Sequence, residues 1–199
     1  MNDQKILVVL VHGFCANRFV MWPLAHLLRR KGFRVRQWSY NSFFEPVATH
    51  AKRLSDFLGA IQKSERCFHV VAHSMGAIVA RSALHQCEQQ NLGRLVFLAP
   101  PNRGSPVAKI ASKWLGRVLP PLDDLSDART SYVNQLPGGT DLEIGIIAAR
   151  FDVLVPAQNT HLPEEKGHVV LNATHNSLLF SRAVGGLTAN FLNTGSFSF

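Results

Sequence analysis

The sequence predicts an α/β fold, in which one mostly parallel sheet of about six strands carries helices on both faces. Short apolar runs rich in β-branched residues alternate with segments of helical periodicity along almost all of the 199 residues. Several of these runs are apolar throughout, as strands covered on both faces usually are. The length suits one sizeable core and falls short of two typical domains, so a single domain over residues 1–199 is expected.

The expected elements follow one another in a regular order. Strands are predicted at Lys5–Val11, Phe33–Tyr40, Cys67–Ala72, Arg94–Ala99, Leu142–Ala149 and His168–Leu171. Helices are predicted at Trp22–Lys31, Pro46–Gln62, Met75–Gln89 and Asn176–Leu192. Gly32 ends the first helix, and Gly185 with Gly186 weakens the middle of the last one.

Residues 101–140 do not fit this alternation. They are rich in proline, contain the pair Gly138–Gly139 and hold one short amphipathic pattern at Val107–Val118. The segment is long for a βα connection, so we expect an excursion over the carboxyl ends of the strands, where open α/β sheets bind ligands. Its helix either packs permanently on the sheet, or part of the segment walls a substrate pocket and its second half moves as a small flap.

Composition excludes some classes of partner. The formal charge is +8, but the basic residues are scattered, and the one triple, Arg29–Lys31, ends a predicted helix, where cations complement the helix dipole. Because no basic patch is interleaved with aromatic residues, no nucleic-acid partner is expected. A transient contact with an anionic membrane surface stays open, and so does the oligomeric state.

The cysteines, histidines and acidic residues predict neither a metal nor a cofactor. Cys15, Cys67 and Cys87 are odd in number and lack C-x-x-C spacing, which argues against disulfides and zinc. No histidine–aspartate cluster has metal-ligand spacing. The absence of a visible signal peptide and the free thiols favour a cytoplasmic location, although a trimmed mature chain would look the same.

The stretch A-H-S-M-G, Ala72 to Gly76, lies where a predicted strand meets a predicted helix. A nucleophilic serine needs such a tight strand-to-helix turn, with small residues two positions away on either side. Ala72 and Gly76 supply them, and the N-terminus of the following helix favours negative charge beside Ser74. The alternative is that Ser74 only caps the helix.

Three other segments fit a serine nucleophile in chain order. His12-Gly13-Phe14 follows the first strand, Asp152 follows a buried strand, and His175 follows the last strand. The rival bases are His161 and His168, and the rival acids are Asp141 and Glu143, at positions that suit a catalytic group less well. His73 and His12 are interpreted as supporting side chains, and Asp123, Asp124 and Asp127 as solvated.

Together, "VHGF", "AHSMG", "FDVLVP" and "ATHNSLL" resemble the α/β-hydrolase superfamily. The closer likeness is to small lipases and esterases of the triacylglycerol-lipase type and to the hydrolase module of GPI inositol-deacylase-like proteins, and "APPNRGSPVA" adds to it. The resemblance covers almost the whole chain. It implies a minimal α/β-hydrolase fold without a large cap domain, and Ala72 replaces the first glycine of the usual motif.

The resemblance also implies a role for each residue. Ser74 is expected to attack an acyl carbonyl, His175 to carry the proton, and Asp152 to hold the imidazole. The backbone N–H groups of Phe14 and Met75 are expected to form the oxyanion hole.

The expected activity is hydrolysis of carboxylic esters, either of lipids or of short acyl chains. Thioester hydrolysis and acyl transfer by the same triad are alternatives, and a catalytically silent binding protein is a third. For the acyl chain we expect a lining from Phe43 and Phe44, which follow a strand, and from Trp22.

Overall fold

A computed structural model of the protein describes residues 5–86, 90–138 and 141–198. The strands are β1 Leu7–Val11, β2 Arg34–Trp38, β3 Phe68–His73, β4 Leu92–Leu98, β5 Ile144–Ala149 and β6 Glu165–Leu171. The longer helices are α1 Trp22–Arg30, α2 Val47–Gln62, α3 Met75–Leu84, α4 Pro106–Leu115 and α7 Arg182–Thr194. Short helices are α5 Pro121–Asp124, α6 Tyr132–Gln135 and the 3₁₀ turns η1 Arg18–Met21, η2 Ala157–Asn159 and η3 Ser177–Phe180.

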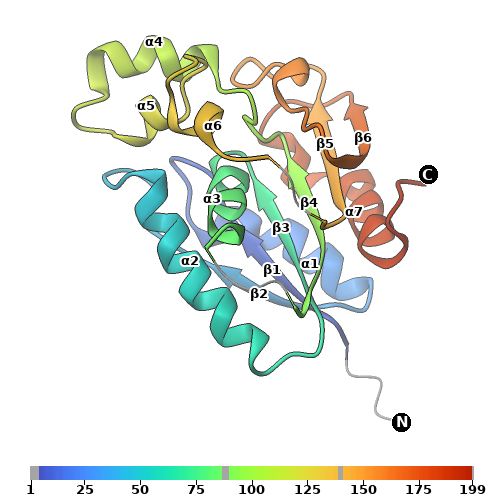
Figure 1. Ribbon diagram of the computed structural model, residues 1–199. Coiled ribbons are helices and arrows are strands. Elements are labelled where there is room, and N and C mark those ends of the chain that lie inside the picture. The colour runs from blue at the N-terminus through green and yellow to red at the C-terminus, as the bar shows by residue number, and fades with distance from the viewer. Residues whose placement is uncertain (1–4, 87–89, 139–140, 199) are drawn as a thin grey trace.

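The six strands form one sheet in the order β2-β1-β3-β4-β5-β6, and every neighbouring pair is parallel. Helices lie on both faces (Figure 1). The predicted fold class is therefore confirmed. Because all strands run the same way, the residues that follow β1, β3, β4, β5 and β6 gather at one edge of the sheet, which is the edge that forms binding sites in open α/β folds. Within the described residues, no helix is long and apolar enough to cross a bilayer.

Alternate side chains of the central strands enter two different cores. In β1, Leu7, Val9 and Val11 join the core under α2 and α3. The two residues between them, Val8 and Leu10, join the core under α1 and α7. All five are buried, so β1 is apolar throughout for the reason expected of a strand covered on both faces.

Two helix boundaries differ from the prediction. The helix expected at Asn176–Leu192 is interrupted at Ser181, whose side chain accepts a hydrogen bond from the N–H of Val184 and starts α7 there. Gly185 lets α7 approach α1 closely, since a Cβ atom built on it would lie 2.9 Å from Leu27 of α1. The helix expected to reach Gln89 ends at Leu84, and residues 87–89, including Cys87, lie outside the described residues.

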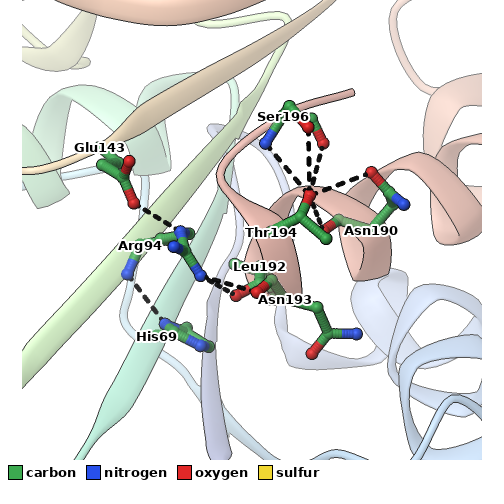
Figure 2. A network of polar contacts seen from close by, with 8 residues as sticks. All are labelled: His69, Arg94, Glu143, Asn190, Leu192, Asn193, Thr194 and Ser196. Atoms are coloured by element: carbon green, nitrogen blue, oxygen red, sulfur yellow. Dashed lines mark hydrogen bonds and ion pairs between the residues drawn. The ribbon is translucent and has the colours of Figure 1, made fainter. Parts of the chain in front are cut away.

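At the far end of the sheet, Arg94 of β4 joins several elements (Figure 2). Its side chain pairs with Glu143 at 2.6 Å and donates to the carbonyl oxygens of Leu192 and Asn193 at 3.0 Å each. Its N–H donates to Nδ1 of His69 at 2.8 Å. A cation on the last carbonyl groups of α7 also complements the dipole of that helix, so Arg94 fixes α7 on the sheet.

Replacing Arg94 by alanine should lower the free energy of unfolding by about 2 kcal/mol, because charge-assisted hydrogen bonds to the end of α7 are lost. Denaturant unfolding measures the change. Arg34→Ala is the matched control, since it removes an ion pair with Glu65 from a partly exposed arginine and should cost about 1 kcal/mol or less. Equal losses in the two variants would contradict the assigned role of Arg94.

Candidate active site

Ser74 occupies a strained turn between β3 and α3. Its φ of 53° and ψ of −126° put a residue other than glycine in the left-handed half of φ space. Its N–H donates to the carbonyl of Leu98 at the end of β4, at 2.9 Å. Within the described chain, the Ser74 hydroxyl makes no capping hydrogen bond to α3. The interpretation of Ser74 as a simple helix cap is therefore wrong.

Two glycines allow this turn to pack against the end of β1. A Cβ atom on Gly76 would lie 2.4 Å from the carbonyl oxygen of His12. A Cβ atom on Gly13 would lie 2.9 Å from the Cβ of Ser74. The turn after β1 thus lies directly against the serine, and larger residues at either glycine would push it away.

Asp152 and His175 meet after the last two strands. Nδ1 of His175 donates to Oδ2 of Asp152 at 2.6 Å, and the Asp152 side chain is completely buried. The other carboxylate oxygen, Oδ1, accepts from the N–H groups of Leu154 and Val155 at 2.9 Å each. Because a carboxylate can only accept, the proton of neutral His175 is on Nδ1, and its Nε2 is free to take a proton.

His73, which precedes the serine, supports His175. Its Nε2 donates to the backbone carbonyl of His175 at 3.2 Å, and the two rings lie 4.8 Å apart. Burial, assisted by the nearby His175, lowers the pKa of His73 to about 3. His73 is therefore neutral at pH 7 and does not oppose a positive charge on His175.

His12 fixes the turn after β1. Its Nε2 accepts from the N–H of Tyr40 at 3.3 Å, so its Nδ1 donates to the carbonyl of Gly13 at 2.9 Å. The Tyr40 hydroxyl donates to the His12 carbonyl at 2.8 Å, and the two rings stack. Burial lowers the pKa of His12, which keeps it neutral. These bonds hold Gly13 and Phe14 in place over the serine.

One cavity joins these groups. Its volume is about 570 Å³, and Ser74, His73 and His175 line it together with Phe14. Further lining residues are Cys15, Ala16, Asn17, Val20, Pro101, Ser105, Val107, Ala108, Ala111, Leu122, Leu125, Leu154, Val155 and Asn176. Met75 is the first residue of α3, so its N–H belongs to the helix end that has no partner within the helix.

The predicted aromatic lining lies elsewhere. Trp22, Phe43 and Phe44 are not among the residues that line the cavity. Trp22 stacks on His26 at the surface, and Phe44 is 61% exposed. Phe43 contacts Phe14, which does line the cavity, with ring centroids 5.6 Å apart. Phe43 and Phe44 follow β2 as expected, but the residues after this strand do not contribute to the lining, and Trp22 begins α1.

Much of the lining comes from the segment that follows β4, which carries α4 and α5. The prediction that this segment contributes a wall of the pocket agrees with the position of Ala108, Ala111 and Leu122. Individual lining residues could not be chosen from the sequence. Sequence reasoning missed Leu154 and Val155 as lining residues. Their position two and three residues after Asp152 was a signal that could have found them.

The rival bases and acids have other partners. His161 and His168 stack on each other at 3.8 Å, and with Glu165 they form a group whose ligand atoms all lie within 4.8 Å, which linear spacing had not suggested. His161 is hydrogen-bonded to Glu165 and His168 to Thr160, so these rings brace the β5–β6 connection.

Among the acidic residues, Glu143 pairs with Arg94 at the opposite end of the sheet. Asp127 pairs with Lys109. Asp124 is not solvated as expected. It accepts from the N–H of Val47 at 2.7 Å and caps α2 from a partly buried position that raises its pKa.

A sequence profile of the alpha/beta hydrolase family matches residues 8–165, which is most of the chain. The chain belongs to the alpha/beta hydrolase family. No curated protein matches it in sequence.

Solved structures share the fold of this hydrolase. The propeptide form of the lipase BlEst2 from Bacillus licheniformis superposes with a TM-score of 0.80 at 18% identity, over 100% of this chain and 52% of that one. The mature form gives 0.74 at 18% identity, over 98% and 94%. The monoacylglycerol lipase of Paleococcus ferrophilus gives 0.69 at 14% identity, over 96% and 95%. The hydrolase therefore spans about half of the propeptide form of the lipase and nearly all of the mature form.

Replacing Gly13 by alanine should lower turnover of a p-nitrophenyl ester by about 100-fold with little change in KM, because the new methyl group displaces the backbone N–H donors beside Ser74. Steady-state kinetics measure this. Gly59→Ala is the control, since nothing lies within 4 Å of the added atom. A Gly13→Ala protein with unchanged turnover would mean that the turn does not contribute to the site.

Proposed function

We propose that this protein is a serine hydrolase that cleaves carboxylic esters through an acyl-enzyme on Ser74. The observation that carries the proposal is the hydrogen-bonded pair of Asp152 and His175. His175 lines the same cavity as Ser74, which is held at a φ of 53°. A nucleophile, a base with a free Nε2 and a buried acid that orients it are the parts that acyl transfer through serine requires.

The reaction proceeds in two halves. The Ser74 hydroxyl adds to the ester carbonyl while Nε2 of His175 takes its proton, and the oxyanion lies against the N–H groups of Phe14 and Met75. His175 then returns the proton to the leaving alcohol, and the C–O bond breaks. Water repeats the sequence on the acyl-enzyme, which releases the acid and regenerates Ser74. Asp152 keeps its hydrogen bond to Nδ1 of His175 and stabilises the imidazolium in both halves.

The lining of the cavity favours an acyl substrate. Val20, Leu122, Leu125 and Leu154 offer apolar walls beside the serine, and a volume of about 570 Å³ is within the usual range for small-molecule sites. The substrate is then a lipid ester or an ester of a short acid. Thioester hydrolysis and acyl transfer to an alcohol use the same intermediate and are the second candidate.

The activity can be tested with p-nitrophenyl esters of increasing acyl length. The wild type should hydrolyse them, and Ser74→Ala should lose essentially all turnover. Thermal stability should hardly change, because the Ser74 hydroxyl makes no capping bond to α3. Near wild-type turnover in the variant would remove Ser74 as the nucleophile, and a wild type inactive on every ester and thioester would favour a silent binding protein.

Replacing Asp152 by asparagine should lower kcat by about 10⁴-fold, because an amide at this position favours the wrong tautomer of His175. Asp56→Asn is the control, since it neutralises a surface carboxylate on α2 whose side chain is 70% exposed. The two variants are compared by steady-state kinetics on one ester. If Asp152→Asn matched the control, the base would have to be a different histidine.

A further inference from the structure

The side chains of α4 are arranged in the opposite way to those of an ordinary surface helix. Small residues face the protein, since Ala108 is buried and Ala111 is half-buried. The large apolar residues of the segment face outward. Their exposed fractions are Val107 41%, Ile110 63%, Trp114 85%, Leu115 48% and Val118 62%. A surface helix usually buries its large apolar stripe, whereas α4 packs its small residues inward and leaves the large ones in solvent.

These residues form one face. Ile110 and Trp114 are one turn apart on α4, which places them on one side of the helix, and Val118 lies in the turn that directly follows Leu115. Figure 1 shows α4 at the outer edge of the molecule, beyond the carboxyl ends of the strands. An exposed, contiguous apolar face of this kind indicates a surface that binds another molecule or a membrane.

Basic residues flank this face. Lys109, Lys113 and Arg117 also recur at intervals of four, and residues 103–122 contain no acidic residue. Lys109 is paired with Asp127 at 3.1 Å. Within the described part of the chain, Lys113 and Arg117 make no ion pair. The flank therefore presents net positive charge beside an apolar surface.

The same helix forms a wall of the cavity. Val107, Ala108 and Ala111 line it, and Val107 is exposed as well. Leu154, which also lines the cavity, is 39% exposed, and its carbonyl accepts from the hydroxyl of Ser105 at the start of α4, at 2.6 Å. The apolar face of α4 is thus continuous with the lining of the cavity.

We propose that α4 docks this protein on anionic membranes. Ile110, Trp114 and Val118 enter the boundary between headgroups and acyl chains, and Lys113 and Arg117 bind lipid phosphates. A second copy of the chain fits less well, because a symmetric contact through α4 would bring the basic flanks of the two copies together. The inference rests on the proposed ester hydrolysis, since docking turns the cavity toward the bilayer and makes membrane lipid esters the substrate class.

Vesicle binding tests the surface without catalysis, in the Ser74→Ala background. Flotation is compared on vesicles of phosphatidylcholine alone and on vesicles with phosphatidylglycerol in equal parts. The protein should float with the anionic vesicles, and salt should weaken the binding. Emission from Trp114, taken as the difference from a Trp114→Phe protein, should shift to the blue.

Variants then separate the apolar from the charged contribution. Ile110→Ser with Trp114→Ser should weaken binding by more than about tenfold. Lys113→Gln with Arg117→Gln should weaken it by about 25-fold, at about fivefold for each charge. The controls are Val170→Ser on the edge strand β6, where Val170 is 40% exposed, and Arg30→Gln with Lys31→Gln at the end of α1. Both controls should bind as the parent does.

Several outcomes would overturn the docking surface. These are no binding to anionic vesicles, equal losses in the variants and the controls, or a dimer in solution that Trp114→Ser disperses. With Ser74 intact, the double variant Ile110→Ser with Trp114→Ser should hydrolyse a soluble p-nitrophenyl ester at the wild-type rate. A parent protein that fails to bind anionic vesicles therefore counts against α4 alone, whereas a wild type that is inactive on the soluble ester counts against the proposed function.

Discussion

The close packing of the Ser74 turn against the end of β1 is the constraint on which the rest of the site depends. Gly76 and Gly13 leave no room for a Cβ atom, and the Ser74 N–H is tied to Leu98 on the neighbouring strand. A φ of 53° at the serine persists because contacts on both sides determine it. The strain is thus supported by the middle of the sheet, where β1, β3 and β4 are buried on both faces.

From this turn, hydrogen bonds extend to the other parts of the site. His73 reaches the backbone of His175, which in turn reaches Asp152. His12 links Tyr40, after β2, to the turn that carries Phe14. Burial lowers the pKa of both His12 and His73, so these supporting histidines are neutral at pH 7 and add no positive charge to the site.

The excursion after β4 adds a surface to this frame. Its small residues complete the cavity wall, while its large apolar residues remain in contact with solvent. Leaving Trp114 and Ile110 outside forgoes the stability that their burial would give. The segment that lines the cavity therefore also carries an exposed apolar surface.

The sequence by itself determined the order of strands and helices and the place of Ser74, Asp152 and His175 at strand ends, because turn chemistry and apolar runs are local signals. It predicted that parallel strands would gather these residues at one edge. Only the tertiary structure decided which side chains face the cavity. Periodicity defines an apolar face on α4 but not its direction, and a position directly after β2 did not bring Phe43 or Phe44 into the lining. Those outcomes depend on packing between segments far apart in the chain, as does the burial of Asp124 against the start of α2.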